Sequence, residues 1–176
     1  MSCIITPPQL DRLYFYTEYT GAAKNLIQTM KFRSLKSLSL FLGSLMAGID
    51  FPPVDAVVPI PLSKERLIQR GFNQSYYMAK VISSTKGLPL EHLLLRKLNT
   101  PAQSGLNKKD RQKNIRGAFQ VDRFRGISSI VPGRILLVDD VYTTGATLNE
   151  AAMTLKTAGT KTVFALVFAR TPFDQN

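Results

Sequence analysis

The residues best suited to chemistry in this sequence are two adjacent carboxylates and the small, hydroxyl-bearing residues that follow them. Asp139 and Asp140 come directly after a mainly apolar run, 134–138, and the segment 143–147 then contains three threonines and one glycine. Carboxylates accept hydrogen bonds from sugar hydroxyls. Threonine hydroxyls and the free backbone N–H groups at the start of a helix bind phosphate. The combination predicts a site for a sugar phosphate.

The elements that must position these residues form a strand–helix–strand unit. The runs 134–138 and 163–169 are apolar enough to be buried strands, and residues 147–158 carry apolar side chains on one helical face. Strands that are apolar on both faces are typical of a parallel sheet, whose crossover connections are right-handed. We therefore expect an α/β fold. Ligands bind beyond the carboxyl ends of parallel strands, which is where Asp139 and Asp140 would lie.

A simpler interpretation of this segment is structural. Acidic and hydroxyl residues commonly cap helices, so the two acids and the Thr-Thr-Gly sequence could form only a turn. Two adjacent acids directly after a buried strand are less easily explained in that way. The sequence also lacks the Gly-x4-Gly-Lys-Ser/Thr pattern of a P-loop and the Gly-x-Gly-x-x-Gly pattern of a dinucleotide fold.

The rest of the chain contains further periodic segments and one long polar stretch. The other elements expected are helices over residues 21–30, 35–48 and 74–85 and short strands over residues 54–61 and 93–95. Residues 70–73 are expected to form a turn. Residues 99–116 are polar and basic without periodicity, and loops of that length in a compact domain are usually functional or mobile.

Composition limits the class of protein. The chain has 176 residues, 44% of them hydrophobic and 20% charged, which suits one globular domain and excludes wholesale disorder. Cys3 is the only cysteine and His92 the only histidine, so a disulfide framework and a self-contained Cys/His zinc site are excluded. Residues 37–49 are too few to span a bilayer, and the N-terminus has no signal-peptide pattern. We expect a cytoplasmic protein that does not insert into membranes.

The charge balance favours anionic partners. Lys and Arg total 23 against 12 acids, which gives a net charge of +11. Residues 96–125 hold nine basic side chains and two acids, so most of the excess lies there. Such a run is often only a solvated surface, but it also suits binding to nucleic-acid phosphates. The DNA-binding candidates are Lys108, Lys109, Lys113 and Arg116.

The segment Ile-Leu-Leu-Val-Asp-Asp-Val-Tyr-Thr-Thr-Gly-Ala-Thr, residues 135–147, resembles the signature of type I phosphoribosyltransferases. These enzymes bind 5-phosphoribosyl-1-pyrophosphate (PRPP). The resemblance implies that the paired acids hold the ribose hydroxyls and that the loop holds the 5′-phosphate. It also implies Mg²⁺, held mainly by PRPP oxygens and water rather than directly by the protein. The residues implied are Asp139, Asp140, Val141, Thr143, Thr144, Gly145, Ala146 and Thr147.

Two further blocks resemble the ComF competence-protein family. Residues 55–74 are similar to its VPVPL…R…RGFNQ block, and residues 100–119 to its T..Q..L…R..N..gAF block. With the PRPP signature, the likeness covers nearly the whole chain. It implies a ComFC-type protein of DNA uptake, built on a phosphoribosyltransferase-like domain. The implied partners are PRPP or a related ribose phosphate, single-stranded DNA and proteins of the competence machinery.

The same resemblance assigns roles within the two blocks. The first block would face the pyrophosphate of PRPP, through Pro61, Leu62, Ser63, Lys64, Arg66 and Arg70. The second would form a mobile loop that closes over PRPP, with Gln103, Arg111 and Asn114 at the matching positions. An alternative for Lys64 and Arg66 is a solvated helix start. No residue is identified as catalytic, and two interpretations stay open: a phosphoribosyltransferase, or a non-catalytic accessory protein that binds single-stranded DNA through the basic loop.

The resemblance also predicts a domain layout. ComFC-type proteins usually begin with a zinc finger of two Cys-x-x-Cys pairs, and Cys3 with the residues up to Asp11 resembles the stretch that follows the last finger cysteine. We therefore expect residues 1–20 to be a remnant linker and residues 21–176 to be the phosphoribosyltransferase-like domain. Within it, residues 21–50 would form a helical hood and residues 99–116 a mobile basic loop. No zinc is expected in this chain.

Overall fold

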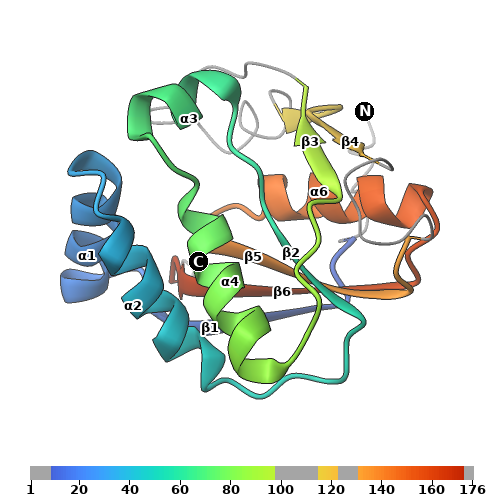
Figure 1. Cartoon of the computed structure of the whole chain (residues 1–176), viewed down its shortest axis with the longest axis horizontal. Coiled ribbons are helices and arrows are strands. Elements are labelled where there is room, and N and C mark those ends of the chain that lie inside the picture. Colours follow the sequence, from blue (N-terminus) through green and yellow to red (C-terminus); the bar gives the residue numbers. More distant parts are fainter. Residues whose placement is uncertain (1–8, 98–114, 123–130, 173–176) are drawn as a thin grey trace, which may run out of the picture.

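A four-stranded parallel sheet forms the centre of the protein (Figure 1). The computed structural model describes residues 9–97, 115–122 and 131–172. The strands lie in the order β1–β6–β5–β2, with bounds Arg12–Glu18, Thr162–Arg170, Arg134–Tyr142 and Ala56–Pro59. All three neighbouring pairs are parallel. The α/β fold with a parallel sheet, predicted from the apolar strands, is confirmed.

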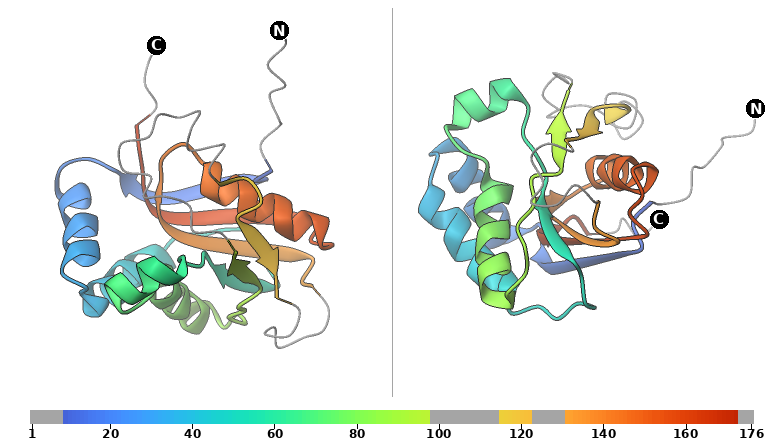
Figure 2. Two further views of the ribbon diagram at one scale, coloured as in Figure 1. Left: turned by 90° about the horizontal axis from the view of Figure 1, so that it is seen from above. Right: turned by 45° about the vertical axis from the view of Figure 1, so that its right-hand side comes forward.

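Helices cover both faces of this sheet (Figure 2). One face is covered by α1, α2 and α4, with bounds Gly21–Phe32, Lys36–Ala47 and Gln74–Lys86. The other face is covered by α6, Ala146–Thr157. Alternate residues of β5 enter the two cores, because successive side chains of a strand point to opposite faces. Leu136 and Val138 pack with the first set of helices, whereas Ile135 and Leu137 pack with α6.

A second, two-stranded antiparallel sheet lies beyond the carboxyl end of β2 (Figure 1). It consists of β3, Leu94–Arg96, and β4, Phe119–Val121. The short helix α3, Lys64–Arg70, lies between β2 and α4 in the chain. Ser63 caps its start, accepting a hydrogen bond from the Arg66 backbone N–H, and Gly71 ends it in the left-handed conformation with a φ of 73°.

The structure corrects the predicted domain boundary at residue 20. Residues 12–18, assigned from the sequence to a linker, form β1 and pair with β6. The Asp11 carboxylate fixes the start of this pairing, because it accepts a hydrogen bond of 2.7 Å from the Val163 backbone N–H and forms a 2.9 Å ion pair with Lys156. Exposed and half-buried residues do not alternate along β1, so this strand lacks the period-two pattern by which a strand is predicted from sequence.

Among the described residues, no helix is both long enough and apolar enough to cross a bilayer.

A candidate ligand cleft at the carboxyl end of β5

The predicted site residues meet in a cleft of about 320 Å³ at the carboxyl ends of β2 and β5. Five residues of the PRPP signature line it: Asp139, Asp140, Val141, Thr143 and Thr147. Four residues of the first ComF-like block line it as well: Pro61, Leu62, Arg66 and Arg70. The sheet explains this meeting, because β2 and β5 are neighbouring parallel strands whose carboxyl ends share one edge.

The two acids lie within β5 rather than after it, because β5 pairs with β6 as far as Tyr142. Asp140 is buried, with 4% of its surface exposed. Its Oδ1 accepts a 2.9 Å hydrogen bond from Lys31 Nζ, and its Oδ2 accepts a 2.8 Å hydrogen bond from Gln74 Nε2. Asp139 is half-buried, and its Oδ1 accepts hydrogen bonds from Ser75 Oγ at 2.8 Å and from the Asp140 backbone N–H at 2.9 Å.

The environment of Asp139 disfavours its ionised form. Burial is the largest cause and the negative charge of Asp140 adds to it, and together they raise the pKa of Asp139 to about 6. The hydrogen bonds from the Asp140 backbone and Ser75, and the positive charge of Lys31, oppose this rise. Asp139 therefore changes its protonation state close to neutral pH.

Residues 143–145 form a loop that leads into α6, whose first two residues are Ala146 and Thr147. These five residues, called the helix-start loop 143–147, line a smaller pocket beside Asp139. Gly145 is the N-cap residue of α6 and has a φ of 75°, a left-handed conformation that favours glycine. The Gly145 carbonyl accepts hydrogen bonds from the backbone and the side chain of Asn149. This arrangement leaves the first turn of α6 at the pocket, where unpaired N–H groups of a helix start can bind an anion.

Three arginines form a basic wall of the cleft. Arg66 and Arg70 belong to α3, and Arg96 belongs to β3. Burial lowers the pKa of Arg70 and of Arg96, and the repulsion from Arg66 acts in the same direction, while Asp139 opposes both. Arginine nevertheless stays charged at neutral pH. Partly buried, mutually repelling cations favour an anionic ligand, such as a pyrophosphate group.

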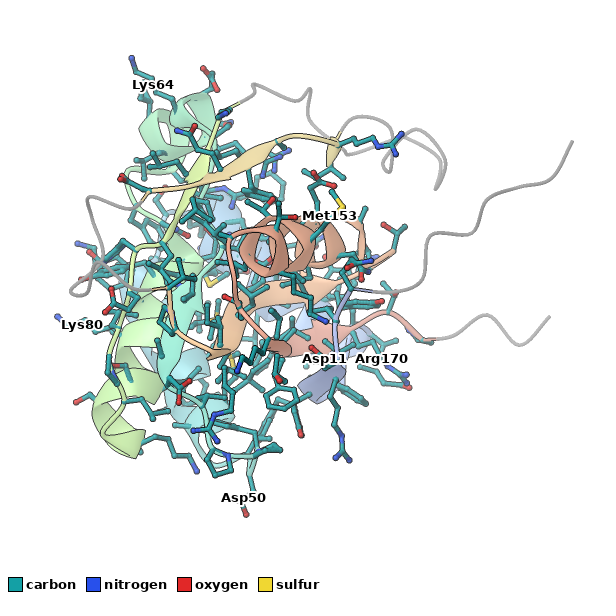
Figure 3. All side chains as sticks on the ribbon, turned by 90° about the vertical axis from the view of Figure 1, so that its right-hand side faces the viewer. Asp11, Asp50, Lys64, Lys80, Met153 and Arg170 are labelled. Carbon is teal, nitrogen blue, oxygen red and sulfur yellow. The ribbon has the colours of Figure 1, made fainter. Side chains whose placement is uncertain are left out.

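Two residues of the predicted pyrophosphate side are not among those that line the cleft. Ser63 is buried and caps α3 through its hydroxyl. Lys64 is exposed and points away from the body of the protein (Figure 3). Lys64 points to solvent because it begins the short helix α3, as in the alternative interpretation of a solvated helix start. Its first residue, Lys64, faces solvent, while Arg66 and Arg70, which are four residues apart, share its cleft-facing side.

Sequence reasoning missed several residues of the cleft. Tyr19, Lys31, Gln74 and Arg96 line it although none was predicted as a site residue. Only Gln74 had a signal in the sequence, because it closes the RGFNQ-like block. The predicted mobile-loop and DNA-binding residues Gln103, Lys108, Lys109, Arg111, Lys113 and Asn114 lie outside the described residues. Arg116 is described and is exposed.

Comparison with known proteins gives relatives of one kind. No protein-family model matches the chain. Competence protein F of Haemophilus influenzae is 29% identical over 180 residues, which cover 96% of this chain and 77% of that protein. The DNA utilization protein YhgH of Escherichia coli K12 is 29% identical over 181 residues, 96% of this chain and 76% of that protein. Competence protein ComFC of Bacillus subtilis is 41% identical over 103 residues, 58% of this chain and 39% of that protein.

Among solved structures, the chain is similar to the glutamine PRPP amidotransferase of B. subtilis, solved in complex with ADP and GMP. The TM-score is 0.51 and the sequence identity 21%, over 75% of this chain and 26% of the enzyme. The similarity thus concerns the fold and about a quarter of the enzyme's length. Together the comparisons confirm the resemblance found in the sequence: the chain is similar to competence proteins F and ComFC, and it has a type I phosphoribosyltransferase-like fold.

Proposed function

We propose that the protein binds PRPP, or a related ribose phosphate, in the cleft at the carboxyl end of β5. The observation that carries this proposal is the arrangement of three features around one cleft. A carboxylate pair suited to hydroxyl groups, the helix-start loop 143–147 and the basic wall line the cleft and the pocket beside it. A ligand that presents a phosphate, a diol and a second anionic group suits these three features, and PRPP has all three.

Each part of the ligand has a proposed partner. The 5′-phosphate binds the backbone N–H groups and threonine hydroxyls of residues 143–147. The ribose hydroxyls donate hydrogen bonds to the carboxylates of Asp139 and Asp140. The pyrophosphate binds Arg66 and Arg70, and charge-assisted hydrogen bonds of this kind are stronger than neutral ones.

Mg²⁺ is proposed to enter with the ligand. This cation prefers oxygen ligands and retains several waters, so pyrophosphate oxygens and water supply most of its coordination. The carboxylate chemistry of Asp139 fits such an ion, because this half-buried group borders the cleft and ionises near neutral pH. Mg²⁺ would neutralise part of the pyrophosphate charge beside Asp139.

The biological setting is proposed from the relatives. Proteins named competence protein F and DNA utilization protein match nearly the whole chain. We therefore place the proposed PRPP binding in DNA uptake or DNA utilization.

The test of PRPP binding is a calorimetric titration of PRPP with Mg²⁺ into the wild type and into the Asp139→Asn/Asp140→Asn variant. The wild type is expected to bind saturably. The variant is expected to bind at least about 100-fold more weakly, because two charge-assisted hydrogen bonds are lost at about 1.5–3 kcal/mol each. Asp50→Asn is the control, since Asp50 is fully exposed, does not line the cleft, and lies at the opposite end of the molecule from Lys64 of α3 (Figure 3). Unchanged binding by the double variant would refute the proposed site.

A second candidate function is binding of single-stranded DNA through residues 96–125. The observation that favours it is the concentration of nine basic residues and two acids in this segment. The Lys108→Glu/Lys109→Glu/Lys113→Glu variant is expected to bind single-stranded DNA more weakly and to reduce the slope of log K against log salt by about 2. The binding can be followed by fluorescence anisotropy at several salt concentrations.

The control for this variant has the same net charge. It carries three Lys→Glu changes at exposed positions outside the segment: Lys24, Lys80 and Lys161. An equal loss of DNA binding in this control would show that only net charge matters and would reject the segment as a specific site. The Asp139→Asn/Asp140→Asn variant should bind DNA as tightly as the wild type or more tightly.

A further inference from the structure

The carboxylate of Asp140 is buried, and side chains of the protein hold both of its oxygens. Only 4% of the residue is exposed, and each of its two oxygens accepts a hydrogen bond from a side chain of another element. Lys31 of α1 donates to Oδ1 and Gln74 of α4 donates to Oδ2. Each oxygen keeps a second lone pair, but the residue is buried and both donors line the cleft beside it. A ligand hydroxyl therefore reaches Asp140 only when one of these two donors moves aside.

The two donors differ in how firmly they are held. Gln74 is buried, with 4% of its surface exposed, and its Oε1 also accepts a 3.1 Å hydrogen bond from Arg70 Nη1. It is the first residue of α4, next to Ser75, which holds Asp139. Lys31 has a flexible four-carbon side chain that is 25% exposed. Lys31 is therefore the donor that can withdraw.

The same ion pair ties α1 to the sheet. Within α1 only Ile27 and Met30 are buried, and the helix begins without a side-chain cap. Lys31 follows Met30 in the last turn, so its ion pair with Asp140 adds a polar link between α1 and β5. In Figure 1, α1 lies at the outer side of the helical layer. A change at Asp140 is thereby coupled to the end of this helix.

We infer that Lys31 is a further residue of the site, which competes with ligand hydroxyls for Asp140 and thereby couples ligand binding to the release of the last turn of α1. This inference rests on the proposed ribose-phosphate function and concerns its regulation. The diol replaces the ammonium group as the donor to Oδ1. The apparent affinity of the site is lower than its intrinsic affinity by the free energy needed to separate Lys31 from Asp140, as for any ligand that binds a less populated state.

The test compares Lys31→Met, which removes the charge and keeps the length of the side chain, with Lys24→Met. Lys24 is an exposed lysine of the same helix, so it controls for charge and for helix propensity. Titration with PRPP and Mg²⁺ is expected to show binding about fivefold to tenfold tighter in Lys31→Met than in the wild type, which corresponds to the loss of one competing ion pair. Lys24→Met is expected to bind like the wild type.

Amide hydrogen exchange provides a second measurement on the same proteins. In the wild type, PRPP is expected to speed exchange in the last turn of α1. In ligand-free Lys31→Met, that exchange should already be faster than in Lys24→Met, and PRPP should not increase it further. Asp140→Asn, which keeps the shape of the side chain, should also speed it.

The outcomes separate this inference from the proposed function. If Lys31→Met binds PRPP as tightly as the wild type, or more weakly, the competition is overturned. It is also overturned if PRPP slows exchange in the last turn of α1, because Lys31 would then hold the ligand. Binding by neither protein overturns the proposed function and the competition with it. Binding by Lys31→Met alone supports both.

Discussion

The Gly145→Ala variant is expected to lose about 2–4 kcal/mol of unfolding free energy and to bind PRPP at least about 100-fold more weakly. Gly145 has a φ of 75°, which strains any residue with a Cβ. A Cβ at this position would also lie 2.6 Å from Cζ of Tyr142 and 2.8 Å from its Cε2. Either the Tyr142 ring or the loop 143–147 must therefore shift, and both line the proposed phosphate-binding pocket.

The measurements are denaturant unfolding and calorimetric titration with PRPP and Mg²⁺. Gly87→Ala is the matched control, because Gly87 has a similar φ of 66° but a Cβ there meets no atom within 4 Å. It should lose about 1 kcal/mol through backbone strain alone and bind PRPP normally. Adding Tyr142→Ala to Gly145→Ala should restore the binding lost to the collision. A Gly145→Ala variant no less stable than Gly87→Ala would contradict the close packing against Tyr142.

The affinity for PRPP is expected to rise as the pH increases through about 6, the pKa of Asp139. Ionised Asp139 accepts hydrogen bonds from ribose hydroxyls, whereas its protonated form is a poorer acceptor. Below the pKa the contribution of Asp139 should fall about tenfold for each pH unit. Several charged or polar groups face Asp139 and set this value: Asp140 on β5, Lys31 on α1, Ser75 on α4, Arg70 on α3 and Arg96 on β3.

The effect of Asp139 on stability has the opposite sign. Its pKa is about 6 in the folded protein and 3.8 in the unfolded chain, so the folded state binds more protons than the unfolded state between these values. The stabilisation by the Asp139 proton is fully present below pH 4 and is lost as the pH rises through 6, by about 2–3 kcal/mol.

The check for both effects is the difference between the wild type and Asp139→Asn. The affinity for PRPP over pH 5–8 also depends on the ionisation of the ligand's phosphates. The Asp139→Asn variant shows this phosphate contribution alone, so subtracting it leaves the contribution of Asp139. Unfolding by denaturant over pH 4–7 should show the wild type losing stability relative to the variant. A difference that does not change with pH would mean that Asp139 does not titrate in this range.

The sequence by itself determined the central unit of the fold and the place of its chemistry. The acids, the loop 143–147 and α6 are consecutive in the chain, so local pattern was enough to put the carboxylates beside a helix start. The parallel sheet followed from strands that are apolar on both faces, since such strands are stable only between two layers of helices. The pairing of β2 with β5 then brought Arg66 and Arg70 to the same edge.

The tertiary structure alone decided which side chains hold the acids. Lys31, Gln74 and Ser75 lie 109, 66 and 64 residues from the carboxylates that they contact. Such distant partners leave no periodic or spacing signal in one sequence. The direction of the Lys64 side chain could not be predicted for a similar reason. It depends on the orientation of the short helix α3, which is set by packing against other segments.

The same limit applies to β1, whose assignment to the sheet comes from pairing with β6, about 150 residues further along the chain. Its exposed and half-buried residues carry no alternation, so backbone pairing rather than side-chain pattern makes it a strand. Local residue patterns thus specified where this protein presents its paired carboxylates and the start of α6. The packing of remote segments decided the hydrogen bonds, the burial and the ionisation of those carboxylates. Burial and electrostatic interactions depend on distance in space and not on distance along the chain.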